Sequence, residues 1–428
     1  MSARDRVLDL LLGSERVTAQ AGITSVCSAH PLVLEAACRE AKRAGTAVLI
    51  EATCNQVNQD GGYTGMTPAD FRTFVLGIAR DAGLAAERVI FGGDHLGPNP
   101  WKTLPADEAM AKAEAMVAAY VAAGFRKIHL DCSMGCKGEP AALADEVVAE
   151  RAGRLAHVAE ATAQAAGLPL PVYIIGTEVP PPGGATYEIQ AIEVTAASAA
   201  ERTLAVHREA FAAGGAEAAL ERLIGLVVQP GVEFGNANVV VYDPPAARDL
   251  SEALERLPGM VFEAHSTDYQ PVEALSALVD DGFAILKVGP GLTFALREAL
   301  YGLDAIAREL HLGHGKPLPD VMEALMLAEP GNWRSHYSGT PDEQYLQRHF
   351  SYSDRIRYYW THPVAVAAVE RLMSALEGVS IPDTLVSQYL GRLYPAVAAG
   401  TLAAKPKALC LAAVDAALAP YRTATMRG

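Results

Sequence analysis

An acid and a histidine stand side by side immediately after a buried strand predicted for Val89 to Phe91. Two glycines follow this apolar run, and Asp94 and His95 come next. Consecutive hydrophobic residues are typical of a strand that is covered on both faces, and paired glycines permit a close approach of the backbone. The sequence therefore predicts that the pair lies at the carboxyl end of a strand, where an imidazole can bind a metal ion and a carboxylate can move a proton.

Other acids, a second histidine and a lysine also stand at or next to the carboxyl ends of predicted strands. They are Glu51, Asp131, Glu178, Glu233, His265, Asp268 and Lys287. The carboxyl ends of barrel strands meet at one mouth, so residues that are far apart in the sequence become neighbours there. The whole set suits the binding of a divalent metal and a proton transfer beside a sugar carbonyl. We predict as metal ligands His95, His265 and Glu233, and as catalytic residues Asp94, Asp131, Glu178 and Lys287.

Each of these predictions has a structural alternative. Either histidine could be a hydrogen-bonded structural residue, and Asp94 could cap a loop. Lys287 lies inside an apolar strand, where an amine is costly unless it points into a site or pairs with an acid. It could act as an electrophile, as a phosphate ligand or as a Schiff-base amine, although the last role would duplicate that of a metal. The loop after it, Gly289-Pro290-Gly291, leads into a helix, so its backbone amides could bind a phosphate.

Strands and helices alternate as far as about residue 310, and glycines close the helices. We predict eight strands, which begin near residues 23, 47, 89, 127, 172, 223, 260 and 284. This alternation favours a parallel sheet, and eight strands close a TIM or (β/α)8 barrel. An open doubly wound sheet is the alternative, but no G-x-G-x-x-G follows the first strand and polar clusters follow all eight strands. We therefore predict a barrel for residues 1–310 and a helical extension packed on it for residues 311–428.

The predicted extension contains two aromatic and charged segments, Trp333 to Tyr337 and Ser351 to Trp360. Arg and Tyr side chains suit a phosphate or sugar pocket, and they suit a subunit interface equally well. The third interpretation is an amphipathic helix that packs its aromatic residues on the barrel. The sequence leaves all three open.

Charge and composition disfavour several classes of protein. A formal net charge of −15 without a run of Lys and Arg argues against binding to nucleic acid or to an anionic membrane. No secretory signal or membrane span is predicted, so we expect a cytoplasmic protein whose six cysteines are reduced thiols. Cys132 and Cys136 lack the second pair that a structural zinc site needs. The G-x-x-x-x-G-K-[ST] motif of nucleotide kinases does not occur in the sequence.

Five motifs stand out along nearly the whole chain. They are Gly92-Gly93-Asp94-His95-Leu96-Gly97-Pro98-Asn99, Val228-Gln229-Pro230-Gly231-Val232-Glu233-Phe234, Glu263-Ala264-His265-Ser266-Thr267-Asp268-Tyr269-Gln270, Leu286-Lys287-Val288-Gly289-Pro290 and Tyr352-Ser353-Asp354-Arg355-Ile356-Arg357-Tyr358-Tyr359-Trp360. In this order they resemble the GatZ/KbaZ family, known as the non-catalytic subunit of class II D-tagatose-1,6-bisphosphate aldolase. The resemblance implies a TIM barrel and a role in galactitol, tagatose or N-acetylgalactosamine catabolism. It also implies a GatY/KbaY-type partner that carries out the aldol chemistry.

The resemblance bears on two positions in particular. The Asp94-His95 pair is similar to the Asp-His of catalytic class II aldolases, in which the histidine binds zinc and the aspartate handles the proton. After the sixth strand, relatives commonly read Asp-His after Glu-Phe, whereas this chain reads Gly235-Asn236. A neutral amide is a poor zinc ligand, so one ligand is expected to be missing, although a nearby glutamate could complete the site.

Two functional hypotheses follow. The first is an accessory subunit that supports the activity and stability of a GatY/KbaY-like catalytic partner within an oligomer. The second is a stand-alone, metal-dependent epimerase or aldolase that acts on a ketose, a ketose phosphate or a ketouronate, with zinc as the expected metal. Some members of the family carry the label tagatose 6-phosphate kinase, which no motif in this chain supports.

Overall fold

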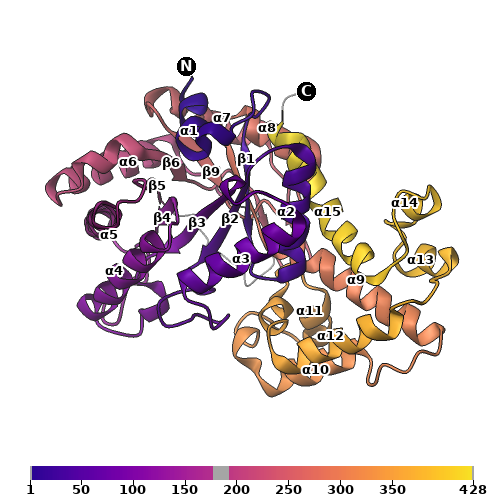
Figure 1. Ribbon diagram of the computed structural model, residues 1–428. Helices are drawn as coiled ribbons and strands as arrows, with labels where there is room; N and C mark the ends of the chain where they lie inside the picture. The colour runs from indigo at the N-terminus through magenta and orange to yellow at the C-terminus, as the bar shows by residue number, and fades with distance from the viewer. Residues whose placement is uncertain (1, 177–191, 427–428) are drawn as a thin grey trace.

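The computed structural model describes residues 2–176 and 192–426. Within these ranges, eight strands form a closed barrel in the order β1-β10-β9-β6-β5-β4-β3-β2. All neighbouring strands of the barrel are parallel, and helices surround them (Figure 1). The predicted TIM barrel is confirmed. The alternative of an open doubly wound sheet is wrong, because the first and last strands pair directly, with Ile23 opposite Ile285.

The barrel strands all overlap the predicted ones. They are β1 (Ile23–Cys27), β2 (Val48–Thr53), β3 (Val89–Leu96), β4 (Lys127–Leu130), β5 (Val172–Gly176), β6 (Leu223–Val227), β9 (Val261–Ala264) and β10 (Ile285–Val288). A separate antiparallel pair, β7 (Glu233–Phe234) and β8 (Val239–Val240), follows β6.

The helices fall into two groups along the chain. Up to residue 310 they are α1 (Ala3–Leu12), α2 (Pro31–Ala44), α3 (Pro68–Ala82), α4 (Ala106–Ala122), α5 (Asp145–Ala166), α6 (Ala197–Ala213), α7 (Pro244–Ala253), α8 (Val272–Asp280) and α9 (Pro290–Glu309). After it they are α10 (Leu318–Ala328), α11 (Pro341–Phe350), α12 (Pro363–Leu376), α13 (Asp383–Tyr389), α14 (Tyr394–Ala398) and α15 (Pro406–Thr425). A short 3-10 helix, η7 (Arg355–Tyr359), lies between α11 and α12.

Local sequence signals explain where the helices begin and end. α3 begins with a capping box, in which the Thr67 hydroxyl accepts a hydrogen bond from the Asp70 backbone N–H and the Asp70 carboxylate accepts one from the Thr67 N–H. The same helix ends at Gly83, whose φ of 75° is the left-handed conformation that glycine adopts without steric cost. These signals fix the lengths of the connections between the strands.

The interior of the barrel changes from apolar to ionic along its axis. α1 packs its buried leucines against the first residues of the strands, among them Leu49 and Ile285, and thereby closes the amino end of the barrel. Glu51 follows Leu49 by two residues, and Lys287 follows Ile285 in the same way. Because the side chains of a strand alternate between its two faces, these charged residues point into the same interior, nearer to the carboxyl end.

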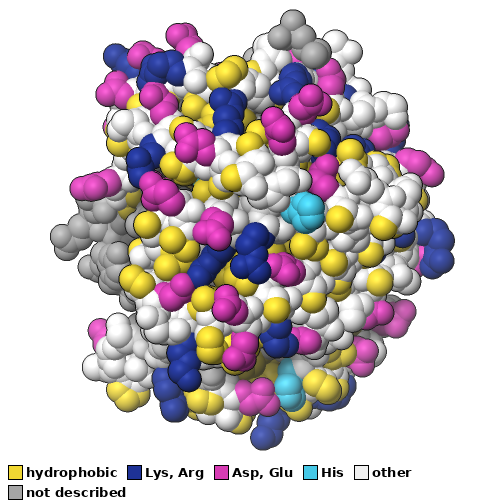
Figure 2. Space-filling view, turned by 90° about the vertical axis from the view of Figure 1, so that its left-hand side faces the viewer, with side chains coloured by type: hydrophobic (Ala, Val, Ile, Leu, Met, Phe, Trp, Pro, Cys, Tyr) yellow, Lys and Arg dark blue, Asp and Glu magenta, His cyan; other side chains and the backbone are white. Residues whose placement is uncertain are grey.

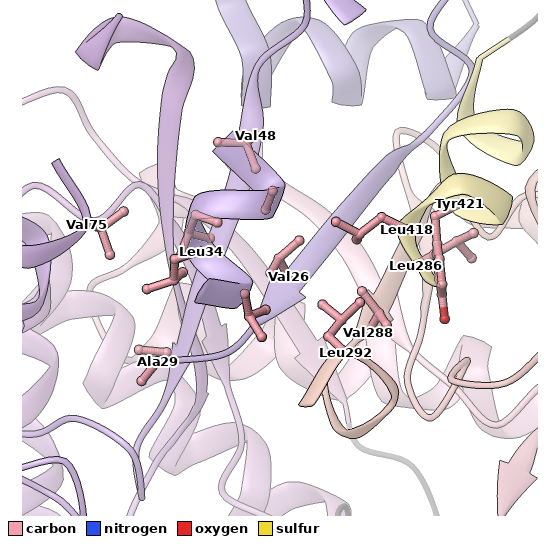
Figure 3. Packing of buried hydrophobic residues seen from close by; sticks show 14 of the residues in the cluster. Val26, Ala29, Leu34, Val48, Val75, Leu286, Val288, Leu292, Leu418 and Tyr421 are labelled. Carbon is pink, nitrogen blue, oxygen red and sulfur yellow. The ribbon is translucent and has the colours of Figure 1, made fainter. Parts of the chain in front are cut away.

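The last helix, α15, packs on the outside of the barrel against α2, α8 and α9 (Figure 1). Figure 3 shows its Leu418 and Tyr421 beside Val26 of β1 and Leu286 of β10. The Tyr421 hydroxyl also donates a hydrogen bond to the carbonyl oxygen of Thr267 at 2.7 Å. Residues from both sides of position 310 thus share one core, and the proposed division at residue 310 stays a prediction.

The helices α10, α11 and α12 lie toward the end of the barrel opposite α1 (Figure 1). Figure 2 shows acidic and basic side chains interspersed over the face that it presents. Among the helices of the described ranges, none combines the length and the hydrophobicity that crossing a membrane requires. All six cysteines are free thiols, and five of them are buried.

Candidate active site

The carboxyl end of β3 carries the Asp94-His95 pair under steric constraint. A Cβ atom on Gly92 would lie 2.6 Å from Cγ of Glu51, so only glycine leaves room for that side chain. His95 has a φ of 50°, and Ser266, which directly follows another histidine, has a φ of 53°. Left-handed conformations of this kind are uncommon outside glycine, cost about 1–3 kcal/mol and cluster at functional sites. The backbone therefore marks the ends of β3 and β9 as parts of a site.

Three imidazole rings and one carboxylate meet at the mouth of the barrel. The ring centroid of His95 lies 4.8 Å from that of His129 and 4.9 Å from that of His265, and the latter two centroids are 5.4 Å apart. One possible ligand atom from each ring and one from Asp94 all lie within 4.8 Å of one another. All four residues are buried. Three histidines are a set of donors that binds zinc in catalytic sites and leaves one position open.

Each of the three imidazoles has one ring nitrogen next to an oxygen acceptor. The pairs, each 2.9 Å apart, are His95 Nδ1 with Asp131 Oδ2, His129 Nε2 with the Gly176 carbonyl oxygen, and His265 Nε2 with Glu263 Oε1. Histidines that bind a metal almost always donate their second N–H in this way, which fixes the tautomer and the orientation of the ring. The opposite nitrogen of each ring would then face a cation, and for His129 the cation would have to replace contacts of Nδ1, which lies 2.9 Å from Asp94 Oδ1 and 3.2 Å from the His95 backbone nitrogen. A divalent metal therefore fits this group of residues.

A buried ionic layer lies next to the imidazoles. Lys127 Nζ lies 2.6 Å from Glu51 Oε1 and 2.7 Å from Glu263 Oε2. Lys287 Nζ lies 2.7 Å from Glu51 Oε2 and 2.6 Å from Asp94 Oδ1. Together with the aspartate that orients the first imidazole, the cluster contains four carboxylates and two ammonium groups. Unbalanced charge is costly in a protein interior, and a bound divalent cation would offset this excess of negative charge.

Asp94 and Lys287 determine each other's charge. Burial disfavours the ammonium form of Lys287. The nearby carboxylates of Asp94, Glu51 and Glu263 outweigh this effect of burial and raise the pKa of the amine well above its ordinary value. Burial likewise favours the neutral form of Asp94, but His95, Lys287 and a second histidine outweigh it and hold the pKa of this carboxyl well below its ordinary value. At neutral pH the pair is thus an ammonium and a carboxylate, and Lys287 is not the free amine that a Schiff base needs.

The cluster opens into a cavity of about 1170 Å³, which is large enough for a small-molecule ligand. Its walls include strand ends of the barrel and four residues of the predicted extension, which are His336, Arg355, Arg357 and Tyr358. The aromatic and charged segments of the extension therefore contribute to the cavity at the mouth of the barrel. Among the three interpretations of these segments, this arrangement favours a pocket.

The structure brings together most of the residues that the sequence singled out. Asp94, His95, His265 and Lys287 line the cavity, and Asp131 lies there beside His95. Their individual roles stay predictions. Glu178 lies outside the described residues.

Two positions near the sixth strand lie elsewhere. Glu233, the third predicted ligand, is buried in β7 outside the group of closely spaced ligand atoms, and its carboxylate accepts a hydrogen bond from the Phe234 N–H at 2.9 Å. The Oδ1 atom of Asn236 accepts hydrogen bonds from the hydroxyls of Ser351 at 2.9 Å and Ser353 at 3.1 Å. Asn236 thus joins the barrel to the extension, and a histidine of another strand, His129, stands beside His95 and His265 instead.

That histidine, His129, and the ionic partners Lys127 and Glu263 were absent from the predicted site. A signal for them was present in the sequence, because charged or imidazole side chains recur at every second position of two otherwise apolar strands. Lys127, His129 and Asp131 form one such series, and Glu263 with His265 forms the other. A period of two places these side chains on one face of each strand, which in a barrel is the interior.

Residues 8–426 match the family described as D-tagatose-1,6-bisphosphate aldolase subunit GatZ/KbaZ-like. The chain belongs to this family. A relative from Agrobacterium fabrum (strain C58 / ATCC 33970), described as D-tagatose 6-phosphate 4-epimerase, is 59% identical over 423 residues, which cover 99% of each chain. The crystal structure of a probable tagatose 6 phosphate kinase from Sinorhizobium meliloti 1021 is similar with a TM-score of 0.88 and 61% identity, and the alignment covers 94% of this chain and 100% of that chain. The resemblance to the GatZ/KbaZ family that the motifs indicated is confirmed.

Proposed function

We propose that the protein is a stand-alone, metal-dependent 4-epimerase that interconverts D-tagatose 6-phosphate and D-fructose 6-phosphate. The observation that carries this proposal is the group of three histidines, each with one ring nitrogen 2.9 Å from an oxygen acceptor. The substrate is taken from the relative described as D-tagatose 6-phosphate 4-epimerase, which is 59% identical to this chain. The proposal corresponds to the second of the two hypotheses from the sequence.

The position of the inverted carbon limits the type of reaction. C4 of a 2-ketohexose is not adjacent to the C2 carbonyl, so its C–H bond is not acidic. The C3–C4 bond can break when the C4 hydroxyl loses its proton, because the bonding electrons move toward the C2 carbonyl and C4 becomes an aldehyde. If the aldehyde presents its other face before the bond forms again, C4 is inverted and no atom is gained or lost. This is aldol chemistry in both directions, in agreement with the description of the family.

The residues of the cluster can divide this work. His95, His129 and His265 would hold the cation, which supplies Lewis acidity at the C2 carbonyl oxygen when it is bound. Asp94 is ionised and would accept the proton of the C4 hydroxyl and return it later. Lys287, 2.6 Å from Asp94, keeps this carboxylate anionic and adds positive charge where negative charge develops.

The direct test is an assay of the purified protein with zinc and D-tagatose 6-phosphate, in which the formation of D-fructose 6-phosphate is measured. We expect turnover without a partner chain, and a loss of more than about 100-fold in His129→Ala. The exposed His157→Ala is the matched control and should keep the activity. In D2O the product should carry no deuterium at C4. A zinc-loaded protein that is inactive, or a product deuterated at C4, would contradict the proposal.

The accessory-subunit hypothesis is the second candidate, and the description of the family as an aldolase subunit favours it. It predicts a chain that is inactive alone but increases the activity and stability of a GatY/KbaY-type aldolase. The His129→Ala variant separates the two hypotheses, because a supporting role that acts through surface contacts should survive this buried change. Galactitol catabolism and assembly into an oligomer belong to the same candidate.

A further inference from the structure

We propose that Arg355 and Arg357, which the helical extension supplies, bind the phosphate group of the substrate in the cavity of the barrel. This inference rests on the proposed function and names the residues that would recognise the phosphorylated end of the sugar. It assigns to the extension a part of the active site.

The backbone N–H groups at the position where many barrels bind phosphate already donate hydrogen bonds to a side chain of this protein. In many barrels a phosphate binds to backbone amides after the seventh and eighth strands, at the start of a helix. Here the N–H groups of Gly289 and Gly291 both donate hydrogen bonds to Oδ1 of Asp268, at 3.0 and 2.7 Å. Pro290, between them, has no N–H to donate. The buried Asp268 carboxylate thus accepts the hydrogen bonds that a substrate phosphate would accept there, so a phosphate in this cavity needs other donors.

Within the described ranges, neither Arg355 nor Arg357 forms an ion pair at salt-bridge distance, and the carboxyl groups that act on Arg357 electrostatically are those of Asp354 and Asp268. Arg355 donates from Nε to the carbonyl oxygen of Asn332. Arg357 donates to the carbonyl oxygen of Asp354 at 3.1 Å and to the hydroxyl of Tyr358 at 2.8 Å. These neutral oxygens satisfy N–H groups but do not pair directly with the positive charge, and buried charges are normally paired. An anion from solution would complete this environment.

Both arginine side chains face the cavity of the proposed active site. They line the same cavity as His95 and Lys287. The Cζ atoms of Arg355 and Arg357 lie 5.1 and 4.4 Å from the centroid of the Tyr358 ring, which therefore orients both. Arginine forks match the geometry of phosphate oxygens, and donors that are already held in place lose less entropy when the ligand binds.

Hydrogen bonds attach the segment that carries the two arginines to the barrel on two sides. The hydroxyl of Thr293, in the first turn of α9, donates a hydrogen bond to Oδ2 of Asp354 at 2.5 Å. On the other side, Asn236 accepts hydrogen bonds from Ser351 and Ser353. The segment therefore has a defined position relative to His95, His129 and His265. A subsite that binds one end of the substrate requires such a fixed position.

The test compares a phosphorylated and an unphosphorylated substrate. We expect Arg357→Gln and Arg355→Gln each to lower kcat/KM for D-tagatose 6-phosphate by about 10–100-fold, which is the loss expected when a charge-assisted hydrogen bond is removed. The value of kcat/KM for unphosphorylated D-tagatose should stay within about threefold of the wild-type value. Arg348→Gln is the matched control, because Arg348 is a buried arginine of the same extension but is already paired with Glu323. Arg357→Lys keeps the charge without the fork and should fall between the two.

A second measurement does not depend on turnover. Titration of inorganic phosphate into the metal-free protein, followed by calorimetry, should show binding that is about tenfold weaker in Arg357→Gln and unchanged in Arg348→Gln. If this dependence is found but no sugar is epimerised, the phosphate subsite stands and the proposed reaction fails. If the wild type epimerises D-tagatose 6-phosphate and folded arginine variants keep the full preference for the phosphorylated sugar, the subsite assignment is wrong.

Discussion

Asp131 contacts the group of three histidines through a hydrogen bond with His95. Its Oδ2 lies 2.9 Å from Nδ1 of His95, and its Oδ1 accepts hydrogen bonds from the N–H and the hydroxyl of Ser133. Burial would raise the pKa of Asp131, but its hydrogen bond to His95 and the nearby charges outweigh burial and lower it. An anionic Asp131 keeps the proton on Nδ1 of His95, and in the proposed metal site Nε2 would then face the cation.

We therefore expect Asp131→Asn to weaken zinc binding by about 10–100-fold, because an amide holds the imidazole tautomer less firmly. A competition titration with a chromogenic zinc chelator measures this affinity directly. Asp249→Asn, an exposed change in α7, is the control and should leave the affinity unchanged. An unchanged zinc affinity in Asp131→Asn would show that this carboxylate does not orient the ligand.

At the scale of elements, the junction between α9 and η7 contains a second buried acid. Asp354 has a φ of 46° and lies next to Arg297 of α9, Arg357 of η7 and Asp268 from the loop after β9. Burial, helped by the negative charge of Asp268, outweighs the two arginines and raises the pKa of Asp354 from 3.8 to about 7. A folded-state pKa above the unfolded value means that the folded protein prefers the protonated acid, so this residue lowers stability as pH rises from about 4 to about 7.

Asp354→Asn mimics the protonated acid, and asparagine tolerates a left-handed conformation. The variant should gain stability over the wild type, and the gain in Tm should be larger at pH 8 than at pH 5 by about 2 °C. Thermal unfolding at both pH values provides the measurement, with Asp249→Asn as a control whose difference from the wild type should not depend on pH. A gain of equal size at both pH values would contradict the elevated pKa of Asp354.

For the molecule as a whole, α15 joins the last residues of the chain to the barrel. Leu418 is 6% exposed and lies beside Val26 of β1 and Leu286 of β10 (Figure 3). Truncation of a buried leucine removes apolar contacts and leaves a cavity. A change at this position therefore tests whether the barrel and the extension unfold together.

We expect Leu418→Ala to lower the free energy of unfolding by about 2–4 kcal/mol in a single transition. Denaturant unfolding followed by tryptophan fluorescence and by far-UV circular dichroism measures it, because Trp101 reports on the barrel and Trp333 and Trp360 report on the extension. Leu327→Ala, at a leucine of α10 that is 52% exposed, should change stability by less than about 0.5 kcal/mol. Two separate transitions would instead support independent units divided near residue 310.

The sequence by itself determined the class of fold and part of the site. Eight apolar strands, each followed by a helix signal and a polar cluster, predicted the barrel, because the alternation of local elements favours only a few topologies. The same local pattern placed Asp94, His95, His265 and Lys287 at strand ends. Motifs along the chain were sufficient to indicate the family.

Only the tertiary structure decided which side chains meet. His95 lies in β3, His129 lies in β4 and His265 directly follows β9. Their rings approach one another because closure and register of the barrel set the height of each residue along its axis. The position of Arg355 and Arg357 in the cavity depends on how the extension folds back over the mouth of the barrel. Contacts between distant segments follow from packing rather than from local sequence periodicity, and for that physical reason the third histidine and the two arginines became part of the site only in the folded chain.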